Sequence, residues 1–213
     1  MKPSAPTRRQ MIENCIARGS LLAGSVALSQ SQLLAFWEQG EAHANKPTST
    51  EVLGPFFRKG APNNTTMRIS GEPGFPLRVT GTVSNTRGQK VPGVRIDIWH
   101  SDHAGLYDVQ GYRYRAKLEV ESASEYAVET ILPGHYDDRP AQHIHYLIGA
   151  PGHKTLITQA YFATDPFFDG DPEKNFKKRN IVTNRELVRP VTLYEGPGPS
   201  RAAIQFDICL ERL

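Results

Sequence analysis

Short runs with strand character, separated by turn residues, recur along the chain from residue 76 to its end. Residues 94–99 (VRIDIW) alternate cleanly, so Val94, Ile96 and Ile98 share one face of an extended strand. Pairs such as Pro92-Gly93 supply turns between the runs. After Ala44 no apolar pattern of helical period is long enough for an ordinary helix. We therefore expect an all-β protein, an antiparallel β-sandwich with long loops. The predicted strands are residues 77–83, 94–99, 125–131, 143–148, 156–162, 188–194 and 203–209.

Composition narrows the class of protein further. Apolar residues make up 38% of the 213 residues and charged residues 22%, and this balance excludes intrinsic disorder. The net charge of +3 is too small to suggest a nucleic-acid partner. One domain is the default at this length.

The first 44 residues differ from the rest of the chain and resemble an export signal. Residues 7–12 (TRRQMI) resemble a twin-arginine motif, an apolar run with small residues follows at 19–36, and residues 42–44 form an Ala-x-Ala cleavage pattern. Ser and Gln interrupt the run, so no membrane span is expected. We predict a twin-arginine-type signal peptide at residues 1–44, a domain at 45–213, and a periplasmic or secreted protein. An N-terminal helix of the domain itself is the alternative.

The strongest local signal for chemistry is His143-Ile144-His145. On a strand, residues i and i+2 point to the same face, so the two imidazoles are placed to chelate a metal ion. The pattern alone is weak, because many such pairs are surface histidines. A three-histidine zinc site is one option, with His153, His135 or His100 as the third ligand.

Two tyrosines add a second signal. Tyr107 lies in a loop after a predicted strand, and Tyr136 precedes His143 by seven residues. Packing, with the hydroxyl bonded to backbone, is the alternative role for each. A free phenol has a pKa of about 10, so it binds a metal at neutral pH only when the ion is strongly acidic, as ferric iron is. Two phenolates and two imidazoles suit Fe(III), because hard anionic oxygens favour the ferric state.

Several blocks of the sequence, in order, resemble the intradiol ring-cleavage dioxygenases of the protocatechuate 3,4-dioxygenase and catechol 1,2-dioxygenase types. The resemblance covers roughly residues 50–170. The matching blocks are 51–57 (EVLGPFF), 79–83 (VTGTV), 96–98 (IDI), 105–107 (GLY), 130–136 (TILPGHY), 139–145 (RPAQHIH) and 156–162 (LITQAYF).

This resemblance implies a β-sandwich enzyme with Fe(III) as its cofactor. Its substrates would be a catechol-type aromatic and O2, and the ring would open between the two hydroxyls to give a muconate-type dicarboxylic acid. The implied iron ligands are Tyr107, Tyr136, His143 and His145.

The resemblance also implies catalytic roles for Tyr136, Arg139 and Gln159. Tyr136 matches the ligand that substrate displaces and that accepts a substrate proton. Arg139 and Gln159 match residues beside the bound ring, where they would stabilise negative charge. His100 and Asp102 match a segment that holds the Tyr107 loop.

Two features depart from the family pattern or are left unassigned by it. Gln142 is an extra residue between Ala141 and His143, and it displaces Arg139 by one position. A basic run at residues 174–179 could attract a carboxylated catechol, although a solvated loop is the favoured interpretation. The competing hypothesis for the whole domain is a transthyretin-like β-sandwich binding module, metal-free or zinc-binding. Homo-oligomerisation is left open.

Overall fold

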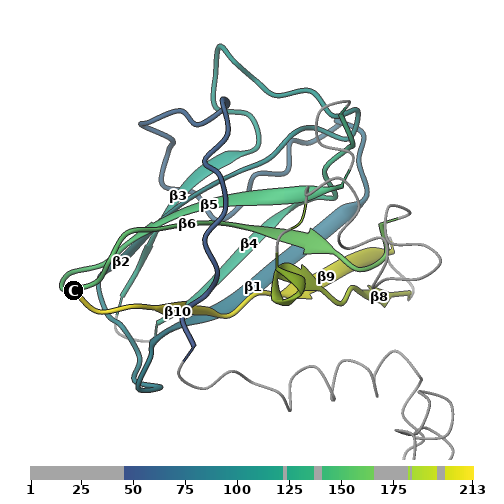
Figure 1. Cartoon of the computed structure of the whole chain (residues 1–213). Coiled ribbons are helices and arrows are strands. Elements are labelled where there is room, and N and C mark those ends of the chain that lie inside the picture. Colours follow the sequence, from purple (N-terminus) through teal and green to yellow (C-terminus); the bar gives the residue numbers. More distant parts are fainter. Residues whose placement is uncertain (1–45, 122–123, 137–140, 166–181, 183, 196–199) are drawn as a thin grey trace, which may run out of the picture. The chain divides into compact units, whose positions relative to one another are not determined.

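A computed structural model describes residues 46–121, 124–136, 141–165, 182, 184–195 and 200–213 (Figure 1). The chain divides into two units, Met1–Gly40 and Glu41–Leu213, and the described residues belong to the second unit. The predicted signal segment, Arg139 and the basic run at 174–179 lie outside the described residues. Within the described part, no helix has the length and apolar character needed to cross a membrane.

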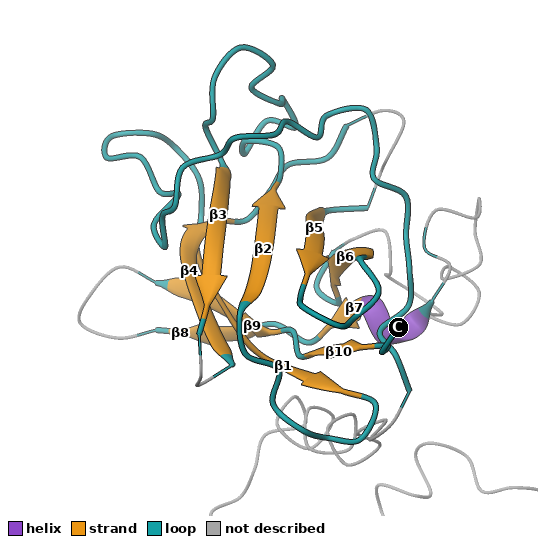
Figure 2. Ribbon diagram, turned by 90° about the vertical axis from the view of Figure 1, so that its left-hand side faces the viewer, coloured by secondary structure: helices purple, strands orange, loops and turns teal. Residues whose placement is uncertain are grey.

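Two five-stranded sheets make up the fold (Figures 1 and 2). The first sheet contains β1 (Pro76–Asn85), β4 (Glu125–Ile131), β8 (Thr192–Tyr194), β9 (Arg201–Gln205) and β10 (Ile208–Leu210). The second has the order β3-β2-β5-β6-β7, with β2 (Val94–Trp99), β3 (Arg115–Val120), β5 (His143–Gly149), β6 (Leu156–Phe162) and β7 (Val188–Arg189). In the described residues the helical content is one 3-10 turn, η3 (Arg185–Leu187). The all-β prediction is therefore confirmed.

The sheets are mixed rather than purely antiparallel. Five strand pairs are antiparallel, among them β1–β4, β2–β3, β2–β5 and β5–β6. Three pairs, β1–β9, β1–β10 and β6–β7, are parallel. Parallel neighbours cannot be joined by a tight hairpin, and β7, β9 and β10 all follow a long connection after their parallel partners.

The predicted strand at 188–194 is two strands in different sheets. β7 pairs with β6, whereas β8 pairs with β9. Pro190 lies between them, and proline has no N–H for a ladder. The change of sheet therefore falls where pairing is already interrupted.

The predicted strand at 203–209 is also divided, into β9 and β10. Phe206 is buried in the core between them, and the Asp207 carboxylate accepts a hydrogen bond from the Thr82 amide at 2.8 Å. Both strands still pair with β1, so the interruption acts as a local bulge.

β3 was not among the predicted strands, although its sequence alternates. Ala116, Leu118 and Val120 are buried in the core, and the charged Lys117 and Glu119 stand between them. The run RAKLEV carries three charged residues and shows its apolar face only at every second position.

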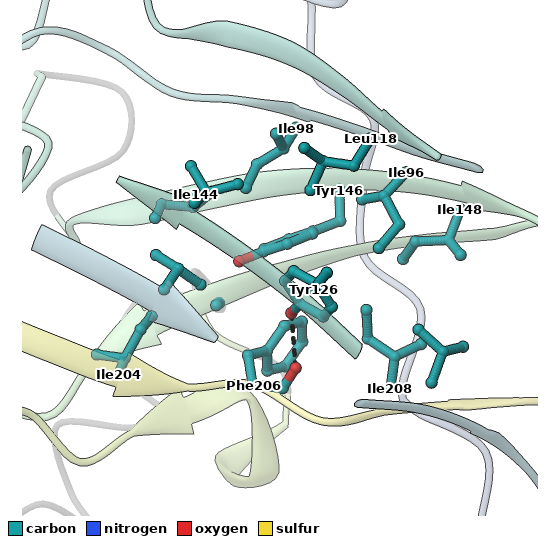
Figure 3. Close-up of a cluster of buried hydrophobic side chains, with 14 of the residues drawn as sticks. Ile96, Ile98, Leu118, Tyr126, Ile144, Tyr146, Ile148, Ile204, Phe206 and Ile208 are labelled. Atoms are coloured by element: carbon teal, nitrogen blue, oxygen red, sulfur yellow. Dashed lines mark hydrogen bonds between the residues drawn. The ribbon is translucent and has the colours of Figure 1, made fainter. Parts of the chain in front are cut away.

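The core lies between the facing surfaces of the two sheets (Figure 3). Ile144, Tyr146 and Ile148 of β5 point into it, and the Tyr146 ring lies 5.0 Å from that of Phe206, centroid to centroid. The buried Tyr126 hydroxyl donates to the Phe206 carbonyl at 2.6 Å, and burial raises the pKa of this phenol well above 10. Because alternate residues of a strand point to opposite faces, this packing turns His143 and His145 away from the core.

Candidate metal centre

The two histidines of β5 lie at one end of the second sheet, where β2 ends and β5 begins (Figure 2). Both side chains are buried, and their Nε2 atoms are 3.1 Å apart. Nδ1 of His143 is 2.7 Å from the Ala141 carbonyl oxygen. A carbonyl only accepts, so Nδ1 carries the proton and Nε2 presents its lone pair to the site.

The two predicted tyrosine ligands reach the same point. The hydroxyl oxygens of Tyr107 and Tyr136 are each 3.5 Å from Nε2 of His143. Their rings meet edge to face, with centroids 5.6 Å apart. Tyr107 comes from the loop after β2 and Tyr136 from the segment after β4, so three separate parts of the chain supply these four side chains.

The loop before Tyr107 is held by short-range hydrogen bonds. Oδ1 of Asp102 accepts from the amides of Ala104 and Leu106, each at 2.9 Å. His100 is buried, with Nδ1 2.6 Å from the Ser101 carbonyl oxygen and Nε2 2.7 Å from the Thr130 hydroxyl. Burial lowers the pKa of His100 to about 4, so the ring is neutral, donates through Nδ1 and accepts through Nε2. This geometry fits the structural role expected for these residues.

The two tyrosine-bearing segments contact each other through glycines. The Gly134 amide donates to the Asp102 carbonyl at 2.7 Å. Gly105 has a φ of +85°, and a Cβ at this position would overlap the His135 carbonyl group. Only glycine allows this approach, which brings Tyr107 and Tyr136 together.

Aromatic rings surround the donor atoms. Phe56 stacks on Tyr107 with centroids 4.2 Å apart and an interplanar angle of 10°. Trp99 stacks on His145, and the ring centroids of Phe57 and Trp99 are 5.1 Å apart. The segment that carries Phe56 and Phe57 precedes β1 in the chain, and it packs against Tyr107 and Trp99 at the site.

Gln159 lies beside the histidines. It is opposite His145 in the β5–β6 register and fully buried. Its Nε2 donates to the Val52 carbonyl at 2.7 Å, and its Oε1 accepts from the Tyr161 hydroxyl at 2.9 Å. The amide therefore joins the sheet to the segment that covers the site.

The extra residue Gln142 has a clear structural place. Its side-chain amide donates to the Pro133 carbonyl at 2.8 Å, and its backbone amide donates to the buried Asp165 carboxylate. Asp165 also contacts Nε2 of His135 at 2.9 Å. Gln142 thus joins the two ends of the segment between Pro133 and His143.

The alternative third histidines are engaged elsewhere. His135 pairs with Asp165, His100 bonds Ser101 and Thr130, and His153 lies in the β5–β6 turn with Nδ1 2.8 Å from the Pro151 carbonyl oxygen. Among the described residues, no group of three His, Cys, Asp or Glu side chains is placed to hold a metal ion. The donors that do converge are two phenols and two imidazoles.

Sequence reasoning missed Trp99 and Phe56. Trp99 precedes His100 and is opposite His145 in the β2–β5 register. The register of two strands far apart in the sequence was needed to find it. Phe56 belongs to the matched block 51–57, which carried no residue assignment.

Comparison with known proteins identifies the family to which the chain belongs. Residues 52–212 match the model of a protein family described as Dioxygenase. Chlorocatechol 1,2-dioxygenase of Rhodococcus opacus is 32% identical over 195 residues, which cover 77% of this chain and 72% of the relative. The chain belongs to the intradiol ring-cleaving dioxygenase family.

Other intradiol dioxygenases resemble the chain over similar lengths. Hydroxyquinol 1,2-dioxygenase of Nocardioides simplex is 33% identical over 174 residues, covering 71% of this chain but 58% of that protein. The dioxygenase domain of a dioxygenase carbohydrate-binding protein fusion from Streptomyces sp. SirexAA-E superposes with a TM-score of 0.66 at 29% identity, covering 79% of this chain and all of that domain. Catechol 1,2 dioxygenase of Acinetobacter radioresistens shares the fold, with a TM-score of 0.70 at 21% identity and coverage of 86% and 69%. As an intradiol dioxygenase, the protein is an oxidoreductase.

Proposed function

We propose that this intradiol dioxygenase uses Fe(III) to cleave a catechol-type aromatic between its two hydroxyls. One molecule of O2 is consumed, and both oxygen atoms enter the product, a muconate-type dicarboxylic acid. The single observation that carries this proposal is the convergence of the Tyr107 and Tyr136 hydroxyls with His145 Nε2 around His143 Nε2.

The donor set fits ferric iron. Tyr107, Tyr136, His143 and His145 would hold the ion through two phenolate oxygens and two imidazole nitrogens. Hard anionic oxygen ligands favour Fe(III), and the backbone bond to His143 Nδ1 already selects the tautomer with Nε2 as the donor. A substrate catechol is a third source of hard oxygen, which suits the same ion.

Held by these four residues, ferric iron would supply Lewis acidity toward the substrate hydroxyls and activation of the ring toward O2. The protein's own part begins with proton transfer, because the Tyr136 phenolate oxygen accepts a proton from a substrate hydroxyl. Phe56 and Trp99 stack on Tyr107 and His145 and orient these two rings at the site. Gln159 and Arg139 stabilise negative charge on the ring and on the reacting oxygen.

Visible spectroscopy tests this function directly. The full-length protein is loaded with Fe(III), its iron content is measured, and absorption is recorded before and after anaerobic addition of a catechol. We expect a red-brown ferric protein whose band shifts with the catechol, followed by a dicarboxylic acid product when O2 is admitted. A protein that stays colourless after ferric loading contradicts the proposal, and a binding module, metal-free or zinc-binding, becomes the better explanation.

We also propose that residues 1–44 are a twin-arginine-type export signal and that the enzyme acts in the periplasm or outside the cell. Arg8-Arg9, the apolar run and the Ala-x-Ala pattern support this. Fractionation of cells that express the wild type and an Arg8→Lys/Arg9→Lys variant tests it. Equal cytoplasmic retention of both proteins contradicts it.

A further inference from the structure

We propose that Arg115 is a positioning residue that holds the Tyr107 ligand in place, an inference that rests on the proposed function. Arg115 begins β3, and its side chain is 4% exposed. It is none of the four proposed ligands, and it lies outside the short sequence blocks that resemble the family. Its guanidinium instead donates hydrogen bonds to backbone carbonyls of two segments that lie beside Tyr107.

The guanidinium bridges two segments that are far apart in the sequence. Its Nε and Nη2 donate to the Asp108 carbonyl at 3.3 and 3.0 Å, and its Nη1 donates to the Phe56 carbonyl at 2.6 Å. A planar group with five N–H donors can serve two carbonyls at once, whereas a lysine ammonium acts as a single point. The contact is therefore specific for arginine.

Both acceptors belong to the immediate environment of the Tyr107 ring. Asp108 is the next residue in the chain, so fixing its carbonyl restricts the backbone that carries the phenol. Phe56 supplies the ring that stacks on Tyr107 at 4.2 Å. Arg115 thus holds the backbone beside Tyr107 and the backbone of the side chain that packs against it.

Asp108 extends the same arrangement to the rest of the loop. Its Oδ1 accepts from the amides of Gln110 and Gly111 at 3.0 and 2.7 Å, and its Oδ2 accepts from the Arg113 amide at 3.0 Å. The carboxylate organises the turn that follows, while the carbonyl is left to Arg115. The loop between β2 and β3 is therefore tied to the start of β3 on which Arg115 stands.

An open surface pocket lies beside this bridge, and both Arg115 and its two acceptor residues, Phe56 and Asp108, line it. Burial also lowers the pKa of the Arg115 guanidinium, so its position carries an energetic cost that the bridge offsets.

Hydrogen exchange of the metal-free full-length protein tests the positioning role without iron. Arg115→Lys keeps the charge but loses the fork, and Arg115→Gln loses both. We expect amides in residues 54–58 and 102–112 to exchange about tenfold faster or more, as for loss of a charge-assisted hydrogen bond, with β2 and β5 unchanged. Arg113→Gln is the matched control, because Arg113 is exposed and pairs with Glu72 at 2.6 Å instead. It should leave both segments protected.

Ferric loading supplies the second readout. In Arg115→Lys we expect the visible band to shift and iron to be released faster, with Arg113→Gln unchanged. The inference is overturned if amides in the two segments of the Arg115 variants exchange at the wild-type rate. It is also overturned if exchange is faster throughout β2 and β5. Faster exchange in the two segments with an unaltered band and unaltered iron release overturns it as well.

The two proposals fail separately. If the wild type itself shows no ferric band, the iron function fails, whereas the exchange data still decide whether Arg115 holds the Tyr107 loop. If neither Arg115 variant folds, the arginine side chains of the wild type are followed by NMR instead. The Nε–H of Arg115, which donates to the Asp108 carbonyl, should exchange with solvent about tenfold more slowly than that of exposed Arg87. Equally fast exchange of the two groups overturns the inference.

Discussion

The indole ring of Trp99 lies parallel to the imidazole of His145, with centroids 4.9 Å apart and planes within 2° of each other. The two residues face each other in the β2–β5 register. The stack fixes the orientation of the ring that presents Nε2 to His143. It therefore connects the stability of the sheet with the geometry of the donor set.

Replacing Trp99 with leucine should weaken both the stability of the sheet and the geometry of the donor set. We expect Trp99→Leu to lower the free energy of unfolding by about 2–4 kcal/mol, as for other large-to-small changes at buried positions, and to reduce iron retention. Denaturant unfolding and iron analysis measure the two effects. Trp99→Phe is the control: Nε1 is buried and has no hydrogen-bond partner among the described residues, so phenylalanine should keep much of the stack. An equal loss of iron in both variants would contradict the stacking argument.

Removing the Tyr107 hydroxyl separates ligation from folding. Tyr107→Phe should abolish or strongly shift the ferric band and reduce activity, while the free energy of unfolding changes by about 1 kcal/mol or less, the usual contribution of one hydrogen bond. Tyr112→Phe is the matched control, because its hydroxyl donates to the Lys59 carbonyl at 3.0 Å. A Tyr107→Phe protein with the wild-type spectrum would remove this tyrosine from the ligand set.

The glycine contact between the two tyrosine segments can be tested by adding one methyl group. Gly105→Ala combines backbone strain of about 1–2 kcal/mol with overpacking of about 1–3 kcal/mol against the His135 carbonyl. Gly88→Ala carries the strain alone, since Gly88 has a φ of +73° and open space around a Cβ. Unfolding in urea should show the larger loss for Gly105→Ala. Similar losses in the two variants would mean that the segments separate at little cost.

The buried, neutral His100 makes stability depend on pH. Burial lowers its pKa from 6.5 to about 4, so between these values the unfolded chain binds a proton that the folded chain does not. The contribution of neutral His100 to the free energy of unfolding is fully present above pH 6.5 and is lost as the pH falls toward 4. The loss amounts to at most about 3 kcal/mol. Unfolding free energies of the wild type and His100→Gln, measured across this range, should differ in slope. Parallel profiles would show that His100 does not titrate this way.

Local pattern determined much of the sheet structure. The alternation at 94–99 placed β2, and the i, i+2 spacing of His143 and His145 placed both imidazoles on one face. Both follow from the two-residue period of an extended strand, which is a property of neighbouring residues. The sequence blocks also identified Tyr107 and Tyr136, which the structure brings within 3.5 Å of His143 Nε2.

Tertiary structure decided the remaining features. Which strands pair in parallel, and that 188–194 divides between two sheets, depends on partners far away in the chain. The same holds for the side chains around the donors, because Phe56, Trp99 and Arg115 converge on the site from three separate segments. The sequence by itself thus determined the periodicity of the strands and singled out the four side chains that converge in the structure. Only the fold decided their distances and supports, because long-range contacts are chosen by packing and register that no local pattern contains.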